Sequence, residues 1–429
     1  MAELASNRGW GRVVVPPMLE SGSERLRIAA FISHPIQYFA PLWRELASRP
    51  GVQLRVYYFS RMGLEAANDA DFGTSFAWDI DLLGGYESEF LPRQWPTRNP
   101  LHHTPRALNS GLIRALREGW DAVFINGYVH INNWVLTLAA EALSVPVLCF
   151  ADSNLLAERG NSALKLAAKR AFLRRFLPHV QACLAAGGST RRYFEHYGVR
   201  EQDIFICPYA VDVERFEARV RSAGPAGRAE LRARWGIPAD RRIVMFCGKL
   251  VDWNRPLDVL EAIKGLNDPN VVAVFVGEGA LKPALQRDPG RAFAVGFVNQ
   301  TDIPLALSLA DVLVLSSEHE PYGMVVAEAQ SLGVPAVVSD ACGCHGPESV
   351  LEDGVSGFVY PTGDIAALRD RLRRMLYDQE LLGRMRDAAK ARGATQSQVA
   401  AADGFLAAVR HAAGERRGAG RRLTRSWHI

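Results

Sequence analysis

From Arg27 onward, the chain alternates short apolar runs with longer amphipathic stretches, in two successive series. The first series includes "RIAAFIS", "AVFING" and "VPVLCFAD", and the second includes "RIVMFCGKL", "VVAVFVGEG" and "DVLVLSSE". Most runs are apolar on both faces, as parallel strands are when helices cover both sides of a sheet. The pattern predicts an α/β fold of two doubly wound, Rossmann-like domains, which suits a length of 429 residues. Ligands of such sheets bind beyond the carboxyl ends of the strands, so we expect a site in the cleft between the domains.

Changes in composition suggest where the domains begin and end. The predicted segments are a flexible N-terminal extension (1–24), a first domain (25–212), a charged linker containing Gly and Pro (213–240), a second domain (241–395), a C-terminal helix that can cross back to the first domain (396–413) and a basic flexible tail (414–429). The apolar part of the extension is short and interrupted by two prolines, unlike a signal peptide. The six cysteines lie mostly in or beside apolar runs, as free thiols do in a reducing compartment. We therefore expect a cytoplasmic protein.

Charge leaves the partners open. The net charge of +4 gives no argument for nucleic acid. A predicted helix in "SALKLAAKRAFLRRFLPH" carries basic residues among Leu, Ala and Phe. It can lie on an anionic membrane, or pack on the sheet with a solvated basic face. The basic tail can add electrostatic attraction to such a membrane.

Two glutamates in "EPYGMVVAEA", Glu320 and Glu328, stand at the end of a predicted strand and in the helix that follows. Eight residues of helix rise about 12 Å, whereas two carboxylates acting on one glycosidic bond lie roughly 5–10 Å apart. The pair can instead hold two distant hydroxyl-bearing groups of one ligand. The helix N-terminus and Gly323 between them suit a phosphate. A nucleotide sugar is such a ligand. Alternatively, the pattern has no binding role and is a capped helix with one surface glutamate.

This stretch resembles the E-x7-E signature of family 4 retaining glycosyltransferases, which have the GT-B fold of two Rossmann-like domains. Further segments follow in family order: "FCGKLVDWNRPLDVLEAI", "VFVGEGALKPALQ", "VGFVNQTDIP" and "EDGVSGFVYPTGD", with "SHPIQYFAPLWRELA" and "SNLL" in the first half. The resemblance implies a hexosyltransferase-type enzyme (EC 2.4). It would move a sugar from a nucleotide sugar, expected to be UDP-linked, to an acceptor with retention of configuration. Polysaccharide, glycolipid and natural-product biosynthesis are all compatible with it.

The resemblance also implies roles for individual residues. Glu328 would hold the ribose of the donor, Glu320 the transferred sugar, and Lys249 the diphosphate. Further donor-binding candidates are Gly248, Asn254, Gly277, Glu278, Val298, Gly323 and Met324. Lys249, Arg255 and helix N-termini would stabilise the leaving diphosphate. The family mechanism needs no cofactor or metal; two Asp-x-Asp triplets and "ACGCHGPE" are too short as patterns to predict a metal site.

The sequence departs from the family pattern at three positions. Asn254 stands where a second basic residue is usual, and Arg255 is expected to compensate for it at the diphosphate. Asn126 replaces a common histidine, and Phe150 replaces a common basic residue. His34 directly follows the first predicted strand, so we expect it to contact a ligand and assist catalysis; alternatively, it fixes its loop.

The long connection from Arg61 to Pro105 is expected to bind the acceptor, or to form a packed excursion with a small hairpin. The acceptor-side candidates are Gln37, Tyr38, Trp78, Asn126 and His130. The acceptor itself can be a glycan, a lipid-linked sugar or a small molecule. Because of the departures, a non-catalytic nucleotide-sugar-binding scaffold stays open as a second function. A third function is a GT-B nucleotide-sugar epimerase or hydrolase, although the carboxylate pattern of such an enzyme is not evident in the sequence.

Overall fold

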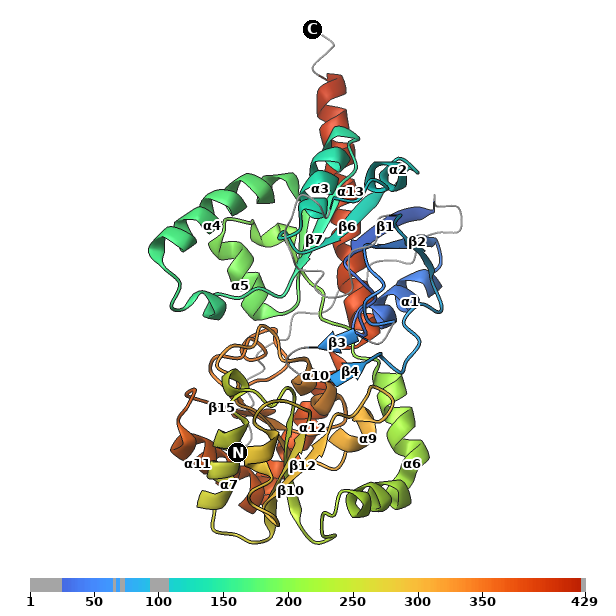
Figure 1. Cartoon of the computed structure of the whole chain (residues 1–429). Helices are drawn as coiled ribbons and strands as arrows, with labels where there is room; N and C mark the ends of the chain where they lie inside the picture. The colour runs from blue at the N-terminus through green and yellow to red at the C-terminus, as the bar shows by residue number, and fades with distance from the viewer. Residues whose placement is uncertain (1–24, 65–66, 70–73, 93–107, 426–429) are drawn as a thin grey trace, which may run out of the picture.

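The computed structural model describes residues 25–64, 67–69, 74–92 and 108–425. Two parallel β-sheets, each covered by helices on both faces, lie one above the other in Figure 1. The predicted α/β fold with two doubly wound domains is therefore confirmed. The predicted N-terminal extension (1–24) lies outside the described residues.

The first sheet has the strand order β5-β2-β1-β6-β7-β8-β9, and all its pairings are parallel. Its strands are β1 (Leu26–Ile32), β2 (Val52–Tyr58), β5 (Glu87–Phe90), β6 (Ala122–Asn126), β7 (Val147–Ala151), β8 (Ala182–Ala185) and β9 (Ile204–Ile206). Helices α1 (Ala40–Ser48), α2 (Leu112–Leu116), α3 (Ile131–Ala142), α4 (Ala163–Phe176) and α5 (Gly188–His196) belong to the same domain. Strand order reverses between β1 and β6, so a crevice is expected where these two strands end.

The second sheet has the order β12-β11-β10-β13-β14-β15, also with parallel pairings. Its strands are β10 (Arg242–Cys247), β11 (Val271–Val276), β12 (Ala292–Gly296), β13 (Val312–Leu315), β14 (Ala336–Ser339) and β15 (Gly357–Tyr360). Its helices are α7 (Pro256–Gly265), α8 (Lys282–Leu285), α9 (Ile303–Leu307), α10 (Met324–Ser331), α11 (Ile365–Tyr377) and α12 (Gln379–Ala394). Here the order reverses between β10 and β13, which places a second crevice opposite the first.

Helix α6 (Val213–Arg234) occupies the stretch that the sequence suggested as a linker. The Asp212 carboxylate begins the helix by accepting a hydrogen bond from the Arg215 N–H at 3.1 Å. Gly224, with φ of 57°, interrupts the helix directly before Pro225, which cannot continue the backbone hydrogen bonding. The connection is thus a broken helix that packs against α9.

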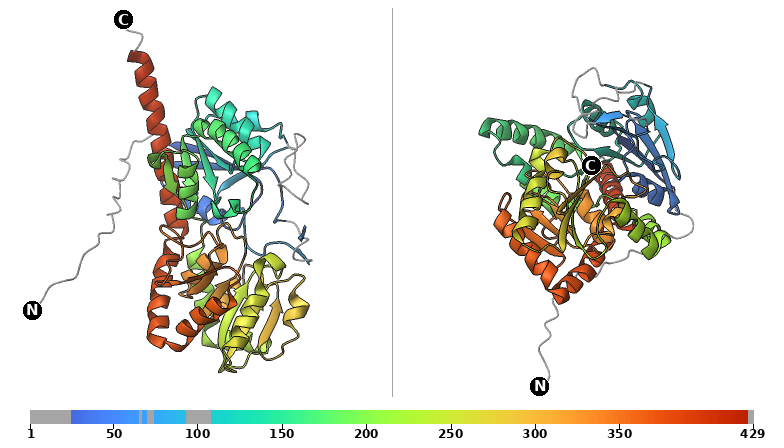
Figure 2. Two further views of the ribbon diagram at one scale, coloured as in Figure 1. Left: turned by 90° about the vertical axis from the view of Figure 1, so that its left-hand side faces the viewer. Right: turned by 60° about the horizontal axis from the view of Figure 1, so that its bottom comes forward.

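Helix α13 (Gln398–Arg425) follows the second domain but packs on the first, against α1 and the β7–β9 edge (Figure 2). The Phe405 ring lies 5.6 Å from that of Phe124 and 6.1 Å from that of Trp43. The helix continues as far as Arg425, so most of the predicted flexible tail (414–429) is helical, in keeping with its content of Arg, Ala, Glu and Leu. Within the part of the chain that the structure describes, every helix is too short or too polar to span a membrane.

The long connection after β2 contains a small antiparallel hairpin, β3 (Ala67–Asp69) with β4 (Thr74–Phe76). This agrees with the alternative of a packed excursion. One hydrophobic cluster extends from the first sheet through α13 into the second domain, and it includes Phe39, Tyr322 and Phe405. The two domains therefore share a continuous apolar core at their junction.

Candidate functional site

The loops that follow the strands of one sheet touch the loops that follow the strands of the other. Asn154 Nδ2, beyond β7, donates to the Pro321 carbonyl beyond β13 at 2.9 Å. The Gly188 N–H, at the start of α5, donates to the Glu348 carbonyl at 3.1 Å, and Arg191 Nε lies 2.6 Å from the Glu348 carboxylate. The carboxyl ends of both sheets thus meet at the junction, where the fold predicts a ligand.

Glu320 lies in the turn between β13 and α10. Its Oε1 atom accepts hydrogen bonds from the N–H groups of Gly323 at 3.0 Å and Tyr322 at 3.3 Å. Burial raises the pKa of Glu320 above its ordinary value, while these two hydrogen bonds oppose the shift. The carboxylate occupies N–H groups beside the helix start that the sequence analysis assigned to a phosphate. In this conformation Glu320 fixes its own turn, with its side chain half-buried at the junction.

Gly323 is required by the geometry of this turn. Its φ of 77° favours glycine, and a Cβ atom there would lie 2.8 Å from Leu315 Cδ2 and 3.3 Å from Cys344 Sγ. Met324, the first residue of α10, is half-buried at the same point. The motif "PYGM" is therefore held close to both the β13 strand and the loop after β14.

Glu328 lies on α10 and is only 4% exposed. The Tyr38 side chain of the first domain approaches this carboxylate, and Gln37, Tyr38 and Glu328 line the same small cavity. Burial raises the pKa of Glu328 to about 7, although the nearby Arg215 guanidinium and the Tyr38 hydroxyl favour the charged form. The sequence analysis placed Gln37 and Tyr38 on the acceptor side; the structure instead places them at the carboxylate expected to hold the donor ribose.

Little space remains around Glu328 in this conformation. The cavity lined by Tyr38, Arg215, Gln300 and Glu328 measures about 10 Å³, enough for at most one water molecule. Arg215 Nη1 closes it further by donating to the Gln300 carbonyl at 2.7 Å. The structure is therefore a closed state in which the first domain covers Glu328.

Backbone contacts bring the glycine-containing loops of the second domain together. The Gly248 N–H donates to the Val276 carbonyl at 3.0 Å, and the Gly277 N–H donates to the Gly296 carbonyl at 2.8 Å. Gly277 has a φ of 142°, and a Cβ atom there would lie 2.0 Å from the Gly248 carbonyl oxygen. Glu278 lies between these loops, and its carboxylate is 2.6 Å from Lys282 Nζ. Gly248, Gly277 and Glu278 thus form one surface beside Lys249.

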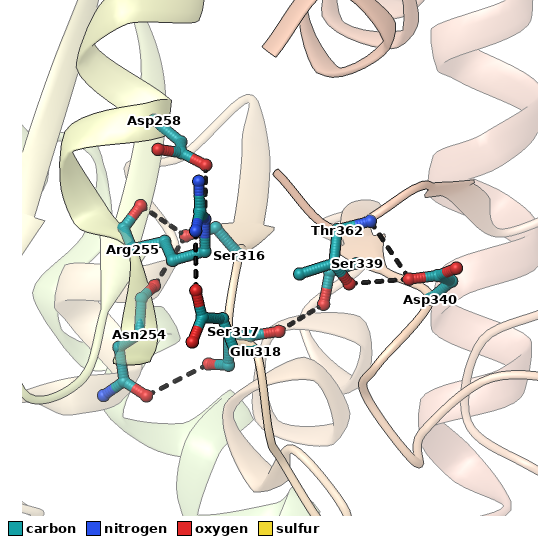
Figure 3. A network of polar contacts seen from close by, with 9 residues as sticks. All are labelled: Asn254, Arg255, Asp258, Ser316, Ser317, Glu318, Ser339, Asp340 and Thr362. Carbon is teal, nitrogen blue, oxygen red and sulfur yellow. Dashed lines mark hydrogen bonds and ion pairs between the residues drawn. The ribbon is translucent and has the colours of Figure 1, made fainter. Parts of the chain in front are cut away.

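Asn254 and Arg255 belong to a polar network that stabilises the second domain itself (Figure 3). Asn254 Nδ2 donates to the Lys249 carbonyl at 2.9 Å, and Asn254 Oδ1 accepts from Ser317 Oγ at 3.2 Å. The Arg255 guanidinium lies 2.6 Å from both the Asp258 and the Glu318 carboxylates. Two acidic side chains already balance its charge, so the structure does not support Arg255 as a replacement ligand for the diphosphate.

His34 and His130 come together at the ends of β1 and β6. His34 Nδ1 is 2.9 Å from Ser33 Oγ. Burial, together with the charge of His130, lowers the pKa of His34 to about 4, so its imidazole is neutral at neutral pH. Asn126 ends β6, and its carbonyl accepts from Asn133 Nδ2 at 2.9 Å, which shapes the turn leading to His130. His34, Asn126 and His130 therefore share the first-domain side of the junction.

Phe150, in contrast, is not part of this side of the junction. It is 1% exposed, and its ring packs 5.1 Å from that of Phe39 and 5.0 Å from that of Tyr209. The aromatic residue at a commonly basic position is therefore part of the hydrophobic core.

Trp78 lies in a strap, residues 77–79, that joins the long connection to the second domain. Asn299 Nδ2 donates to the Ala77 carbonyl at 2.8 Å, and the Thr301 N–H donates to Asp79 Oδ1 at 3.0 Å. Because Asn299 directly follows Val298, the strap reaches the segment expected to lie by the nucleotide base. The Trp78 N–H itself donates to the Gly63 carbonyl at 3.2 Å, and a Cβ atom on Gly63 would lie 3.1 Å from Trp78 Cδ1 and 3.2 Å from the Pro35 carbonyl oxygen. The Trp78 ring therefore lies on the first domain near the loop that follows His34, while the residues on either side of it bond to the second domain.

The sequence analysis did not single out Asp152 and Tyr209. Asp152 directly follows β7, and its Oδ2 atom accepts from Tyr209 Oη at 3.0 Å. Burial raises the pKa of Asp152, and the negative charge of Asp152 raises the pKa of Glu320 across the junction. The position of Asp152, a polar residue just beyond the end of a strand, could have identified it as a site candidate, as the same kind of position identified His34. Arg215 offered no comparable signal, because it lies in a generally charged stretch.

Within the described residues, no group of three or more His, Cys, Asp or Glu side chains is arranged to hold a metal. Asp79 bonds to the second domain, while Asp81 accepts from the N–H groups of Leu83 and Gly84 in its own turn. The other triplet, Asp69 to Asp71, lies partly outside the described residues. Cys342 and Cys344 are buried free thiols beside α10.

Two family profiles match the chain in succession. "Glycosyl transferase 4-like domain" matches residues 35–210, and "Glycosyl transferases group 1" matches residues 227–392. The alpha-D-kanosaminyltransferase of Streptomyces kanamyceticus is 32% identical over 192 residues, covering 43% of this chain and 49% of that protein. A D-inositol 3-phosphate glycosyltransferase of Geodermatophilus obscurus is 28% identical over 282 residues, covering 59% of this chain and 60% of that protein. The chain thus spans about half to three-fifths of these relatives.

The fold is also similar to that of solved structures. Anabaena HepE, solved in complex with UDP and glucose, superposes with a TM-score of 0.64 at 16% sequence identity. The match covers 89% of this chain and 98% of HepE. At this identity the likeness shows the fold, which is the GT-B arrangement of two Rossmann-like domains.

Proposed function

Because the chain belongs to the group 1 glycosyltransferases, we propose that it transfers a hexose from a nucleotide sugar to an acceptor. The observation that carries the proposal is the arrangement around α10. Glu320 and Glu328 flank a glycine-initiated helix start at the junction, and the loops of Gly248 and Gly277 lie beside Lys249 on the same domain. A nucleotide sugar presents hydroxyl groups at both ends and phosphates between them, which suits this order of groups.

The donor is proposed to be UDP-linked. HepE, which shares the fold, was solved with UDP. In our proposal Glu328 binds the ribose hydroxyls, Glu320 binds the transferred sugar, and Lys249 with backbone N–H groups stabilises the leaving diphosphate. Transfer is proposed to proceed with retention and without a metal. Arg255 is left out of this machinery because Asp258 and Glu318 engage its guanidinium.

Donor binding requires the closed state to open. The ribose cannot enter a space of about 10 Å³, so the Tyr38–Glu328 contact has to separate first. Opening would expose Glu328 to solvent and remove the burial that raises its pKa, so the carboxylate would be ionised and could accept hydrogen bonds from the ribose hydroxyls. Closure over the bound donor would then bring the first-domain residues His34, His130 and Asn126 toward the sugar. We place the acceptor on that side.

The test is a thermal-shift screen of UDP-, GDP- and dTDP-sugars, followed by analysis of products. Ligand stabilisation grows with concentration over the dissociation constant, so even micromolar binding is visible. We expect one UDP-sugar to stabilise the protein and to release UDP on incubation, and Glu320→Gln to abolish the release. Product analysis by NMR distinguishes a retained glycoside from a free sugar or an epimer. Binding without any turnover would favour the scaffold, and no binding of any nucleotide sugar would contradict the proposal.

Peripheral contact with an anionic membrane is a second proposal, carried by the surface that α3 and α4 share. Leu164 is 82% exposed, Leu138 56% and Trp134 39%. The Trp134 ring lies 5.1 Å from that of Phe172, so the two helices present these apolar side chains on connected surface. Arg174 and Arg175 at the end of α4 are exposed beside it. Apolar residues flanked by basic ones suit the interface of an anionic bilayer.

A further inference from the structure

Asp152 and Glu320 lie close enough across the domain junction for the Asp152 charge to act on Glu320. Asn154, two residues after Asp152, donates to the carbonyl of Pro321, the residue after Glu320, at 2.9 Å. Tyr209, which donates to the Asp152 carboxylate at 3.0 Å, packs edge-on against the ring of Tyr322 at 5.3 Å. A hydrogen bond and a ring contact therefore join the two turns that carry these carboxylates.

The surroundings of the two carboxylates leave this part of the site negative. Neutral groups donate to both carboxylates: the Tyr209 hydroxyl donates to Asp152, and the N–H groups of Tyr322 and Gly323 donate to Glu320. The nearby His319 imidazole lowers the pKa of Glu320, but burial and the Asp152 charge act in the opposite direction. Arg191, at the same junction, is paired with Glu348. Two partly buried carboxylates in such a setting favour a ligand that donates hydrogen bonds or carries positive charge.

Asp152 belongs to the first-domain side of the junction. Strand β7 lies next to β6, with Phe150 in register with Asn126, and β6 lies next to β1. Asp152 therefore continues the row of strand-end residues formed by His34 and Asn126. That row is neutral at His34, whose pKa is lowered to about 4, and negative at Asp152. The Asp152 end of the row therefore favours a neutral or cationic group over a phosphate.

We propose that Asp152 contacts the acceptor, accepting hydrogen bonds from hydroxyl or ammonium groups beside the attacking hydroxyl, and that it selects against acceptors carrying a phosphate there. The inference rests on the proposed function, since it takes Glu320 as the residue next to the transferred sugar. Tyr209 is a positioning residue that orients the Asp152 carboxylate. The acceptor class that fits is a polyol, a sugar or an amino-bearing ring that is neutral or cationic near the reacting hydroxyl.

Three cyclitols with similar rings and different charges test this assignment. They are myo-inositol, which is neutral, myo-inositol 3-phosphate, which is anionic, and 2-deoxystreptamine, which is cationic. Their binding to the UDP-saturated full chain is measured by calorimetry for wild type, Asp152→Asn and Tyr209→Phe. We expect wild type to bind the neutral or the cationic ring about tenfold more tightly than the phosphorylated one, because like charges disfavour close approach. Asp152→Asn, which can still accept from Tyr209, should remove most of this preference while changing UDP affinity by less than about twofold.

Asp203→Asn is the matched control. Asp203 is another aspartate of the first domain, but it bonds to Arg200 and His411 and lies away from Glu320 in the fold. Asp203→Asn should leave the preference for the neutral or cationic ring unchanged. Tyr209→Phe should weaken this preference in part. Equal or tighter binding of the phosphorylated ring, no effect of Asp152→Asn, or binding of none of the three would overturn the assignment. Failure of wild type to bind UDP would instead contradict the proposed function, so the two failures are distinguishable.

Discussion

Among single residues, Glu328 should dominate the pH dependence of the closed state. Its pKa is raised from 4.5 to about 7 in the fold. Below pH 4.5, Glu328 is protonated in both the folded and the unfolded protein, and its contribution to the stability of the fold is complete. As the pH rises from 4.5 to 7, the unfolded protein loses this proton first, so the folded protein loses stability. The difference corresponds to at most about 3 kcal/mol of unfolding free energy. Ionised Glu328 therefore lowers the free energy of unfolding of the ligand-free protein at neutral pH.

Glu328→Gln should therefore stabilise the ligand-free protein relative to wild type at pH 8, and much less so at pH 5. Denaturant unfolding at the two pH values measures this difference directly. Glu261→Gln, at a glutamate on α7 that is paired with Lys264 and whose side chain is 55% exposed, serves as the control. An equal effect of Glu328→Gln at both pH values would show that Glu328 does not titrate in this range.

Tyr38 is predicted to compete with the nucleotide for Glu328. Tyr38→Phe removes the hydroxyl that lies near the carboxylate in the small cavity. Because this polar contact no longer has to be broken before the nucleotide enters, UDP affinity should rise by up to about tenfold, the value of about one hydrogen bond. Calorimetry measures the change. Tyr377→Phe is a matched control, since its hydroxyl donates to Asp268 at 2.7 Å on the second domain. Weaker UDP binding by Tyr38→Phe would show that the hydroxyl contacts the nucleotide instead.

At the level of elements, the strap of residues 77–79 should hold the two domains together on the nucleotide side. Asp79→Ala removes the acceptor of the Thr301 N–H, so hydrogen exchange at that amide should become faster by about tenfold or more. Asp81→Ala is the control within the same connection. It should affect only the amides of Leu83 and Gly84, which the Asp81 carboxylate caps. If hydrogen exchange at the Thr301 amide is unchanged in Asp79→Ala, residues 77–79 do not hold the two domains together.

For the whole molecule, the membrane proposal predicts salt-dependent binding to vesicles. Cosedimentation with vesicles containing phosphatidylglycerol should exceed that with neutral vesicles, and should fall as salt screens the attraction. Reversing charge at Arg174 and Arg175 should abolish the difference. Reversing Arg221 and Arg384, exposed arginines on α6 and α12, changes net charge equally and should have little effect. Binding that is insensitive to vesicle charge would contradict the proposal.

The strands that carry the site could be predicted from the sequence, because their apolar runs are continuous and their order along the chain is regular. Strands β5 and β15 could not be predicted in this way. β5 is a half-exposed edge strand with the sequence "ESEF", and β15, "GFVY", has only four residues. The chain positions of Glu320, Gly323 and Glu328 were predictable from local spacing. The contacts that define the closed state were not, because they join distant residues: Tyr38 with Glu328, and Arg255 with Glu318.

The central claim is that Glu328 and the start of α10 bind the nucleotide of a sugar donor. Calorimetric titration of UDP at pH 8 tests it most directly, using wild type, Glu328→Gln and the Glu261→Gln control. The account predicts one UDP per chain for wild type and for the control. It also predicts affinity about ten- to a hundredfold weaker for Glu328→Gln, as expected when a charged hydrogen-bond acceptor is lost. Equal affinity in wild type and Glu328→Gln, or no binding to wild type at millimolar UDP, would contradict it.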